Sequence, residues 1–320
     1  MSTFNYSRPI APIIAIILSI TSLQSYAQVE VLEDNPYQTS IILQLKLADF
    51  ECGISDILRL GVGVRGDYFF PKILSVNAAW HQAVYSTMLA SDAEIWENKN
   101  DNLSQFNMFE AGGRLHLLDR KRNIKAKGYL GSSGMYSYYA KLNGIPVRKI
   151  FALRGGMYST VTPVTSRWST LDNGIAGGIV TKDGSIIGRY TELFTNMRTS
   201  GLYGGFSWSE FANVKYKSHN KTWVSKYFKE VYFDLLYAPN VQFDPFITAN
   251  PNTGILASHE IEPNMEGSLR TSNLGWRLGM YRVRSKRKVN VMFGLEAGAR
   301  QGLFFKGGYF TSSVALSFSS

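Results

Sequence analysis

Residues 289–300 read Val-Asn-Val-Met-Phe-Gly-Leu-Glu-Ala-Gly-Ala-Arg, and this stretch decides the fold. Apolar side chains fill every second position, at Val289, Val291, Phe293, Leu295, Ala297 and Ala299. The positions between them carry Asn290, Gly294, Glu296, Gly298 and Arg300. This alternation predicts a strand with one apolar and one polar face. Strands of soluble sheets centre on about 5–6 residues, so the length and the glycine-and-charge face favour the wall of a transmembrane barrel.

The same period of two recurs along the chain. It is clear at 57–65, 109–117 and 229–235, and it closes the sequence at 310–318. The predicted strands are 38–48, 57–69, 73–86, 106–118, 123–135, 146–159, 174–182, 199–216, 223–237, 268–283, 289–303 and 308–318. We therefore expect an all-β, transmembrane antiparallel β-barrel of about 12 strands. An alternative of about 14 strands follows if Thr181–Gly184 closes a hairpin, Ile186–Phe194 forms a further strand, and another turn is also reassigned so that the number of strands stays even.

The connections between strands fall into two groups by length and charge. Three short ones are basic: 119–122, 217–221 and 284–288. Two long ones, Thr87–Gln105 and Ala238–Gly267, are acidic. Barrels of this kind have short turns at one rim and long loops at the other, so we expect the basic turns in the periplasm and the acidic loops outside the cell.

The N-terminal segment has the features of a secretory signal peptide. Arg8 is its one cation, an apolar run covers Ile10–Ile20, and Ser25-Tyr26-Ala27 is a small-x-small cleavage site. We expect a signal peptide at 1–27 and one barrel domain at 28–320. No later segment offers ~18 uninterrupted apolar residues, as a transmembrane helix would need. Cys52 is the only cysteine, so the chain has no internal disulfide framework.

Taken together, the signal segment, the alternating strands and the terminal Ala315-Leu316-Ser317-Phe318 resemble Gram-negative outer-membrane β-barrel proteins. The resemblance covers residues 28–320 at the level of the fold. It implies residence in the outer membrane, contact with outer-membrane lipid, and recognition by the barrel-assembly machinery during biogenesis. In that family the last strand ends on a C-terminal aromatic residue, whereas here Ser319 and Ser320 follow Phe318. The resemblance names no subfamily and no transported solute.

Charged residues on the polar strand faces are the candidate lumen lining. They are Arg59, Arg65, Glu110, Arg114, Glu230, Asp234, Arg277, Glu296 and Arg300. Mixed signs favour an internal ladder of ion pairs, because a buried charge is costly unless it is paired or hydrated. A selectivity lining for anions is the functional alternative. Within the ladder we expect Arg277, on the preceding strand, to pair with Glu296.

One long loop is more apolar than a solvated loop should be. Its apolar residues include Phe243, Phe246, Ile247, Ile255 and Leu256, which we expect to contact a partner or to fold inward as a plug. No sequence-local nucleophile arrangement or metal-ligand spacing is present, so we predict no catalytic site, metal or cofactor. The formal net charge of +10 comes without a nucleic-acid-binding module, so we expect no nucleic acid as a partner.

Three functions remain open at this point. The first is a narrow pore or structural envelope component with a charge-laddered lumen. The second is a non-conducting barrel that docks a surface or secretion-machinery partner through its long extracellular loops. The third, ranked last, is a lipid-modifying barrel enzyme, which the absence of a nucleophile motif disfavours.

Overall fold

The structure of the protein is a computed structural model. It describes residues 29–33, 41–53, 57–70, 73–88, 105–133, 136–167, 179–187, 192–218, 221–249, 256–262, 271–284, 290–303 and 307–319. The predicted signal peptide, 1–27, lies outside the described residues. Among the described residues, no helix has the length and hydropathy needed to cross a membrane.

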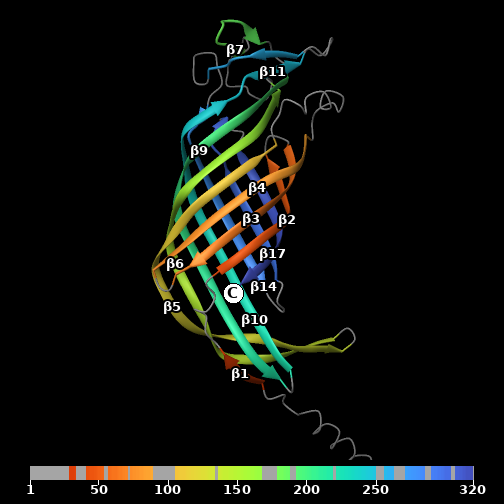
Figure 1. The fold of residues 1–320 in the computed structure, drawn as a ribbon, viewed down its shortest axis with the longest axis vertical. Helices are drawn as coiled ribbons and strands as arrows, with labels where there is room; N and C mark the ends of the chain where they lie inside the picture. Colours follow the sequence, from red (N-terminus) through yellow and green to blue (C-terminus); the bar gives the residue numbers. More distant parts are fainter. Residues whose placement is uncertain are drawn as a thin grey trace, which may run out of the picture.

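Ten antiparallel strands close into a barrel (Figure 1). They are β2 (Ile41–Gly53), β3 (Ile57–Phe69), β4 (Leu74–Met88), β5 (Asn107–Ser133), β6 (Tyr136–Arg167), β9 (Glu192–Ser218), β10 (Lys221–Phe243), β14 (Leu274–Arg284), β15 (Asn290–Ala299) and β17 (Gly308–Ser319). Each strand pairs with its neighbour in this order, and β17 closes the ring by pairing with β2. The predicted all-β antiparallel barrel is confirmed.

The predicted number of strands was wrong, because the ring has ten and not twelve or fourteen. The expected strands 106–118 and 123–135 are one strand, β5, and the basic run expected as a turn lies inside it. Across that run the ladder continues, with Arg120 opposite Lys149 and Lys121 opposite Arg148. The run contains no Gly or Pro, the two residues that most strongly interrupt a strand, so an extended strand can continue through it.

The expected strand 174–182 is also not part of the ring. In the described part of this region, β7 (Ile179–Val180) pairs only with β8 (Ile186–Ile187). Between them the Gly184 amide donates to the Thr181 carbonyl, and Gly184 has a positive φ of 83° that suits glycine. The predicted hairpin at 181–184 therefore exists, but it is a small one outside the barrel.

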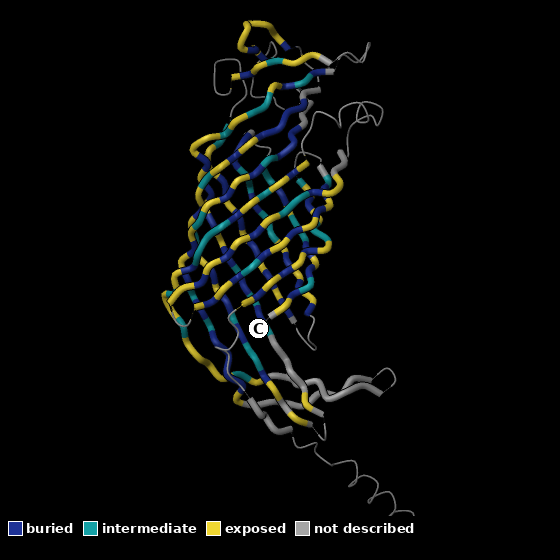
Figure 2. Tube along the Cα trace, viewed as in Figure 1, coloured by how far each residue is buried: buried dark blue, intermediate teal, exposed yellow. Residues whose placement is uncertain are grey.

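The two faces of the wall follow the period of two. In β15 the exposed side chains are those of Val291, Phe293 and Leu295, while Asn290 and Met292 are buried. Figure 2 shows the same alternation of exposed and buried residues along the other strands of the barrel. Exposed apolar side chains thus form an outer belt, which is the arrangement of a barrel surrounded by lipid. The interior holds polar side chains together with a buried apolar cluster that includes Ile42, Phe69 and Met292.

The two ends of the barrel differ. At one end, here called the turn end, neighbouring strands are joined by 70–73, 134–135, 219–220 and 285–289. At the opposite end, the loop end, the connections include 89–106, 168–191 and 244–273. The C-terminus and β1 (Val29–Glu33) lie at the turn end, and β7 and β11 (Phe246–Ala249) lie at the loop end (Figure 1).

Several short strands extend the ring at its ends. At the turn end, β1 adds to β9. At the loop end, β11 pairs with β9 and with β12 (Leu256–His259), while β13 (Thr271–Ser272) pairs with β16 (Gly302–Leu303). Of these additions, β11, β12, β13 and β16 lie at the loop end, and the closed ring itself keeps ten strands.

Candidate functional site: the charged barrel interior

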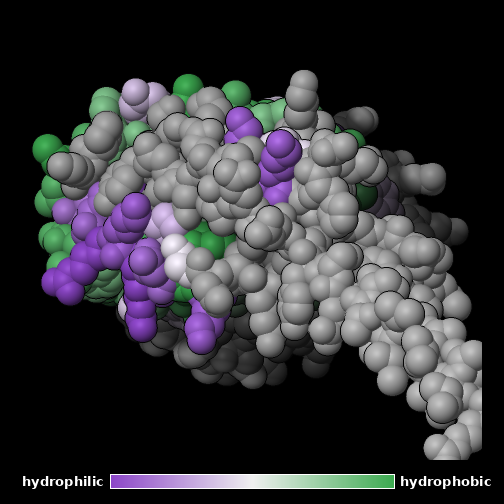
Figure 3. All heavy atoms as spheres, turned by 90° about the horizontal axis from the view of Figure 1, so that it is seen from below, coloured by the Kyte–Doolittle hydropathy of each residue, from purple (hydrophilic) through white to green (hydrophobic). Residues whose placement is uncertain are grey.

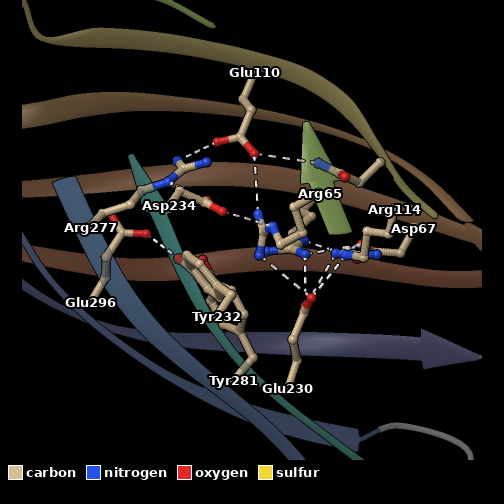
Figure 4. A network of polar contacts seen from close by, with 12 residues as sticks. Arg65, Asp67, Glu110, Arg114, Glu230, Tyr232, Asp234, Arg277, Tyr281 and Glu296 are labelled. Atoms are coloured by element: carbon tan, nitrogen blue, oxygen red, sulfur yellow. Dashed lines mark hydrogen bonds and ion pairs between the residues drawn. The ribbon is translucent and has the colours of Figure 1, made fainter. Parts of the chain in front are cut away.

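The structure places all nine predicted charges on the inner side of the wall. Seven are buried, and Glu296 and Arg300 are half-buried. The seven buried ones are Arg59, Arg65, Glu110, Arg114, Glu230, Asp234 and Arg277. They come from β3, β5, β10 and β14, and they meet across the barrel (Figure 4).

Toward the turn end, two arginines share two carboxylates. Arg65 donates to Asp67 at 2.9 Å and to Glu230 at 3.1 Å. Arg114 donates to the same Asp67 at 2.8 Å, and its Nε lies 2.9 Å from Glu230. Because each carboxylate contacts both guanidinium groups, the four side chains form a closed ring of alternating charge across the lumen.

The middle of the barrel repeats the arrangement with different residues. Arg277 donates to Glu110 at 2.5 Å and to Asp234 at 2.9 Å. Arg154 lies 3.3 Å from Asp234 and 3.5 Å from Glu230, so it joins this group to the one at the turn end. The Arg154 guanidinium also lies 4.1 Å from the centre of the Tyr232 ring. Its charge is therefore offset by two nearby carboxylates and by the face of an aromatic ring.

Nearest the loop end, Glu51 binds two arginines. Arg59 donates to it at 2.8 Å, and Arg300 donates to its two oxygens at 2.5 and 2.6 Å. Each guanidinium lies 4.8 Å from the centre of the Phe106 ring. This group ends the ladder where the barrel opens toward the loops.

The expected pair of Arg277 with Glu296 was wrong. Glu296 lies opposite Gly279 in the β14–β15 ladder and accepts hydrogen bonds from the hydroxyl groups of Tyr232 and Tyr309, the latter at 2.6 Å. Arg277 instead binds Asp234, which lies directly opposite it on the adjacent strand β10, and reaches across the lumen to Glu110 on β5. A long guanidinium side chain can span the narrow interior, so its second partner need not lie on an adjacent strand.

Replacing Glu296 with Gln should therefore cost little stability, about 1 kcal/mol. Arg277 keeps both of its carboxylates in this variant, and the amide oxygen of Gln still accepts from a tyrosine hydroxyl. Urea unfolding of the barrel from lipid vesicles measures the change. A loss of about 3–5 kcal/mol, the cost of an uncompensated buried charge, would show that Arg277 depends on Glu296 after all.

Sequence reasoning missed a second group on β2. Lys46 lies 3.4 Å from Asp49, and the Nδ1 atom of His81 lies 2.7 Å from Asp49. A β-bulge sits between Lys46 and Asp49 in the pairing with β3, and it turns both side chains inward although they are three residues apart. A search for a period of two cannot find such a pair. Sequence reasoning also missed three buried charges, at Arg154, Glu51 and Asp67. Asp67 was missed although it lies two residues after Arg65, which is the spacing of one strand face.

Glycine on the inner face makes room for the aromatic side chains of the interior. A Cβ atom on Gly156 would lie 2.7 Å from the Tyr203 ring, a distance that real Cβ contacts do not show. Tyr203 is buried and lies 4.7 Å from the Arg277 guanidinium. The glycines of the polar face thus let large side chains fill the lumen instead of leaving it open.

The interior is balanced in charge and tightly filled. Eight cations line it in the described residues: Lys46, Arg59, Arg65, Arg114, Arg148, Arg154, Arg277 and Arg300. Eight carboxylates accompany them: Asp49, Glu51, Asp67, Glu110, Asp119, Glu230, Asp234 and Glu296. The cavity among these side chains has a volume of about 40 Å³. A space of this size holds water and is far smaller than a ligand pocket of about 300–1,000 Å³.

An apolar cluster covers the loop end. Its buried members are Val164, Ile179, Ile187, Met197, Phe246 and Ile261, with Val241 and Phe243 packed against them. Of the loop residues singled out in the sequence, Phe246 is 2% exposed and its ring stacks on Phe243 at 5.5 Å between centroids. Ile247 is half-buried and pairs with Phe194. Ile255 and the side chain of Leu256 lie outside the described residues.

Polar contacts hold the same loop to β9. The Thr195 hydroxyl donates to the Asp244 carbonyl at 2.7 Å, and Arg198 donates to both carboxylate oxygens of Asp244 at 3.0 and 3.1 Å. The bonds from Arg198 lower the pKa of the Asp244 carboxyl. The loop therefore has an apolar anchor and a polar one.

Over the described residues, no group of three or more His, Cys, Asp or Glu side chains is placed to hold a metal ion.

Comparisons with solved structures return bacterial outer-membrane barrels. OmpT of Vibrio cholerae is 6% identical, with 91% of this chain and 100% of that chain covered and a TM-score of 0.16. The anion-selective porin from Comamonas acidovorans is 6% identical over 90% and 100% of the two chains, with a TM-score of 0.17. OpdK from Pseudomonas aeruginosa is 10% identical over 89% and 99%, with a TM-score of 0.15. No protein-family model and no curated protein matches the sequence.

The assignment of the fold rests on the strand pairing and the two faces of the wall. The ring is closed, its outer face is an apolar belt, and the nine charged residues expected in the lumen all lie on its inner side. Only a closed barrel lets strands cross lipid with every backbone group paired. The chain has the architecture of an outer-membrane β-barrel protein.

Proposed function

We propose that the protein is an outer-membrane β-barrel with a closed lumen, which acts as a membrane-anchored scaffold and not as an open pore. The observation that carries this proposal is the balanced ladder of ion pairs across the interior. It leaves a cavity of about 40 Å³. A conducting pore needs a continuous hydrated path, whereas here guanidinium groups and tyrosine rings from facing strands meet at contact distance.

The partners that fit this proposal follow from the two surfaces of the wall. Lipid of the outer membrane covers the apolar belt, and the barrel-assembly machinery would insert the chain, with Phe318 exposed on the last strand. An envelope protein would bind outside the membrane. We infer no catalytic role in lipid chemistry: His116 does approach the Ser75 hydroxyl at 3.3 Å, but Ser75 is 0% exposed and lies out of reach of a lipid ester.

Conductance in a planar bilayer tests the closed lumen. The purified barrel should insert without a steady open-channel current. Phe246→Ala, which loosens only the loop-end cluster, should remain silent as well, because the block lies in the charged interior below it. A steady current from the unmodified protein would establish a pore. If only the Phe246→Ala variant conducted, the loop-end cluster and not the charged interior would be what closes the lumen.

Surface labelling tests the orientation. An epitope inserted in the Asp183–Gly184 turn, at the loop end, should bind antibody on intact cells. An epitope between Ser218 and Lys221, at the turn end, should bind only after the outer membrane is permeabilised. The reverse result would place the loop end in the periplasm.

A further inference from the structure

The turn end carries a long two-stranded extension of the wall. The pairing of β4 with β5 ends at Leu74 opposite Leu115, and β6 pairs with β9 only from Arg148 onward. Beyond those points, residues 117–133 of β5 and 136–147 of β6 continue as a hairpin that turns sideways and runs beneath the turn end of the barrel (Figure 1). We call this hairpin the arm.

Positive charge is concentrated on the arm. Residues 117–147 contain six cations, Arg120, Lys121, Arg122, Lys125, Lys127 and Lys141, and one carboxylate, Asp119. The arm therefore has a net charge of +5, against +10 for the whole chain. Arg120, Lys121, Arg122 and Lys125 are exposed. Seen from the turn end, the described hydrophilic side chains gather along one side of the molecule, beside hydrophobic side chains of the wall (Figure 3).

Both edges of the arm are open. Within the described part of the chain, no strand pairs with residues 117–133 of β5 on the side away from β6, or with residues 136–147 of β6 on the side away from β5. Natural proteins usually cover, shorten or interrupt such edges, because unpaired N–H and C=O groups invite another strand. A basic ribbon with two open edges is thus a template for strand addition.

The same end of the protein already binds an acidic strand in this way. Beyond Phe211, β9 parts from β6, and the edge that is freed there pairs with β1. In that pairing Glu30 lies opposite Lys217, and Glu33 lies opposite Lys215. Opposite charges facing each other across an antiparallel ladder stabilise the pairing. The N-terminal segment of the chain thus shows the kind of ligand that fits a basic edge here: extended and acidic.

We propose that the arm is a strand-addition site for an acidic, extended segment of a partner protein at the turn end of the barrel. This inference rests on the proposed scaffold function and supplies its docking surface. An acidic strand would neutralise the arm cations and pair its open backbone edges at the same time. An anionic lipid headgroup would contact the cations and leave the edges unpaired, so the protein strand is the occupant that satisfies both features.

Binding of a designed peptide tests the site. The probe is a fluorescent Val-Glu repeat of eight residues, measured by anisotropy against the full-length barrel in zwitterionic nanodiscs. We expect it to bind, and to bind at least tenfold more weakly to the R120E/K121E/R122E variant. A Val-Lys repeat should not bind. Arg282→Glu, which reverses an exposed cation of the same end outside the arm, should change affinity less than twofold.

A second probe separates strand addition from plain charge attraction. The same peptide with N-methyl groups on alternate residues keeps its charge but loses the backbone donors of one edge, and it should bind at least tenfold more weakly. Equal binding of the two peptides, or equal binding to wild type and the triple variant, would overturn the proposal. So would arm-dependent binding to phosphatidylglycerol vesicles with no binding of the peptide. If the triple variant does not fold, Lys125→Glu serves in its place.

The outcomes for the arm and for the lumen are distinguishable. A barrel that neither conducts nor binds the peptide would refute the arm site but agree with the scaffold proposal. A conducting barrel that binds the peptide would refute the closed lumen and keep the docking surface.

Discussion

Glu230→Gln should destabilise the barrel by about 3–5 kcal/mol, the range for removing one partner from a buried ion-pair network. Glu230 is 0% exposed and lies within 3.5 Å of Arg65, Arg114 and Arg154. Glutamine has nearly the same shape, so packing is preserved and only the negative charge is lost. The three buried guanidinium groups would then lose one counter-charge, and the cavity of about 40 Å³ leaves little room for water to solvate them.

Urea unfolding from lipid vesicles, followed by tryptophan fluorescence, gives the free energy. Glu260→Gln is the matched control, since Glu260 also pairs with a cation, Lys182, but does so in solvent at the loop end. The control should not differ from the unmodified protein beyond measurement error. If Glu230→Gln behaved like the control, the interior would be hydrated, and the case for a closed lumen would fail.

Leu295→Arg is the second substitution with a large expected effect. Leu295 is 43% exposed at the middle of β15, and its neighbours across the ladder are Met280 and Ser312. A guanidinium group at this position would have to enter the hydrocarbon. For a site near the bilayer midplane the expected cost is about 2–4 kcal/mol.

Leu274→Arg is its control. Leu274 is 68% exposed and begins β14 near the loop end of the barrel, where the cost should fall to about 0–1 kcal/mol. The same unfolding titration measures both variants. Equal costs at the two positions would mean that the exposed belt is not graded by depth, and that the barrel does not sit in lipid as assigned.

Much of this fold is readable from the sequence because the faces of a strand are set locally. In 289–300, alternate residues point to opposite sides whatever their partners are, so the lipid face and the inner face follow from the period alone. The lengths of the connections can also be read from the sequence, and the difference between short and long connections distinguishes the two ends of the barrel. The sequence by itself therefore determined the class of fold, the side of the wall on which Phe293 lies, and the side on which Glu230 and Arg277 lie.

Only the tertiary structure decided the features that depend on which strands pair and which side chains meet across the barrel. The run Asp119–Arg122 is compatible with a turn or with a strand, and only its pairing with β6 makes β5 continuous and reduces the ring to ten strands. Arg277 binds Glu110, 167 residues away in the sequence, because β5 and β14 face each other across a lumen that their own residues leave narrow. The bulge on β2 turns Lys46 and Asp49 inward together against the period of two. Strand number, charge partners and the closure of the lumen are properties of the assembled ring, in which each side chain meets residues that its local sequence does not specify.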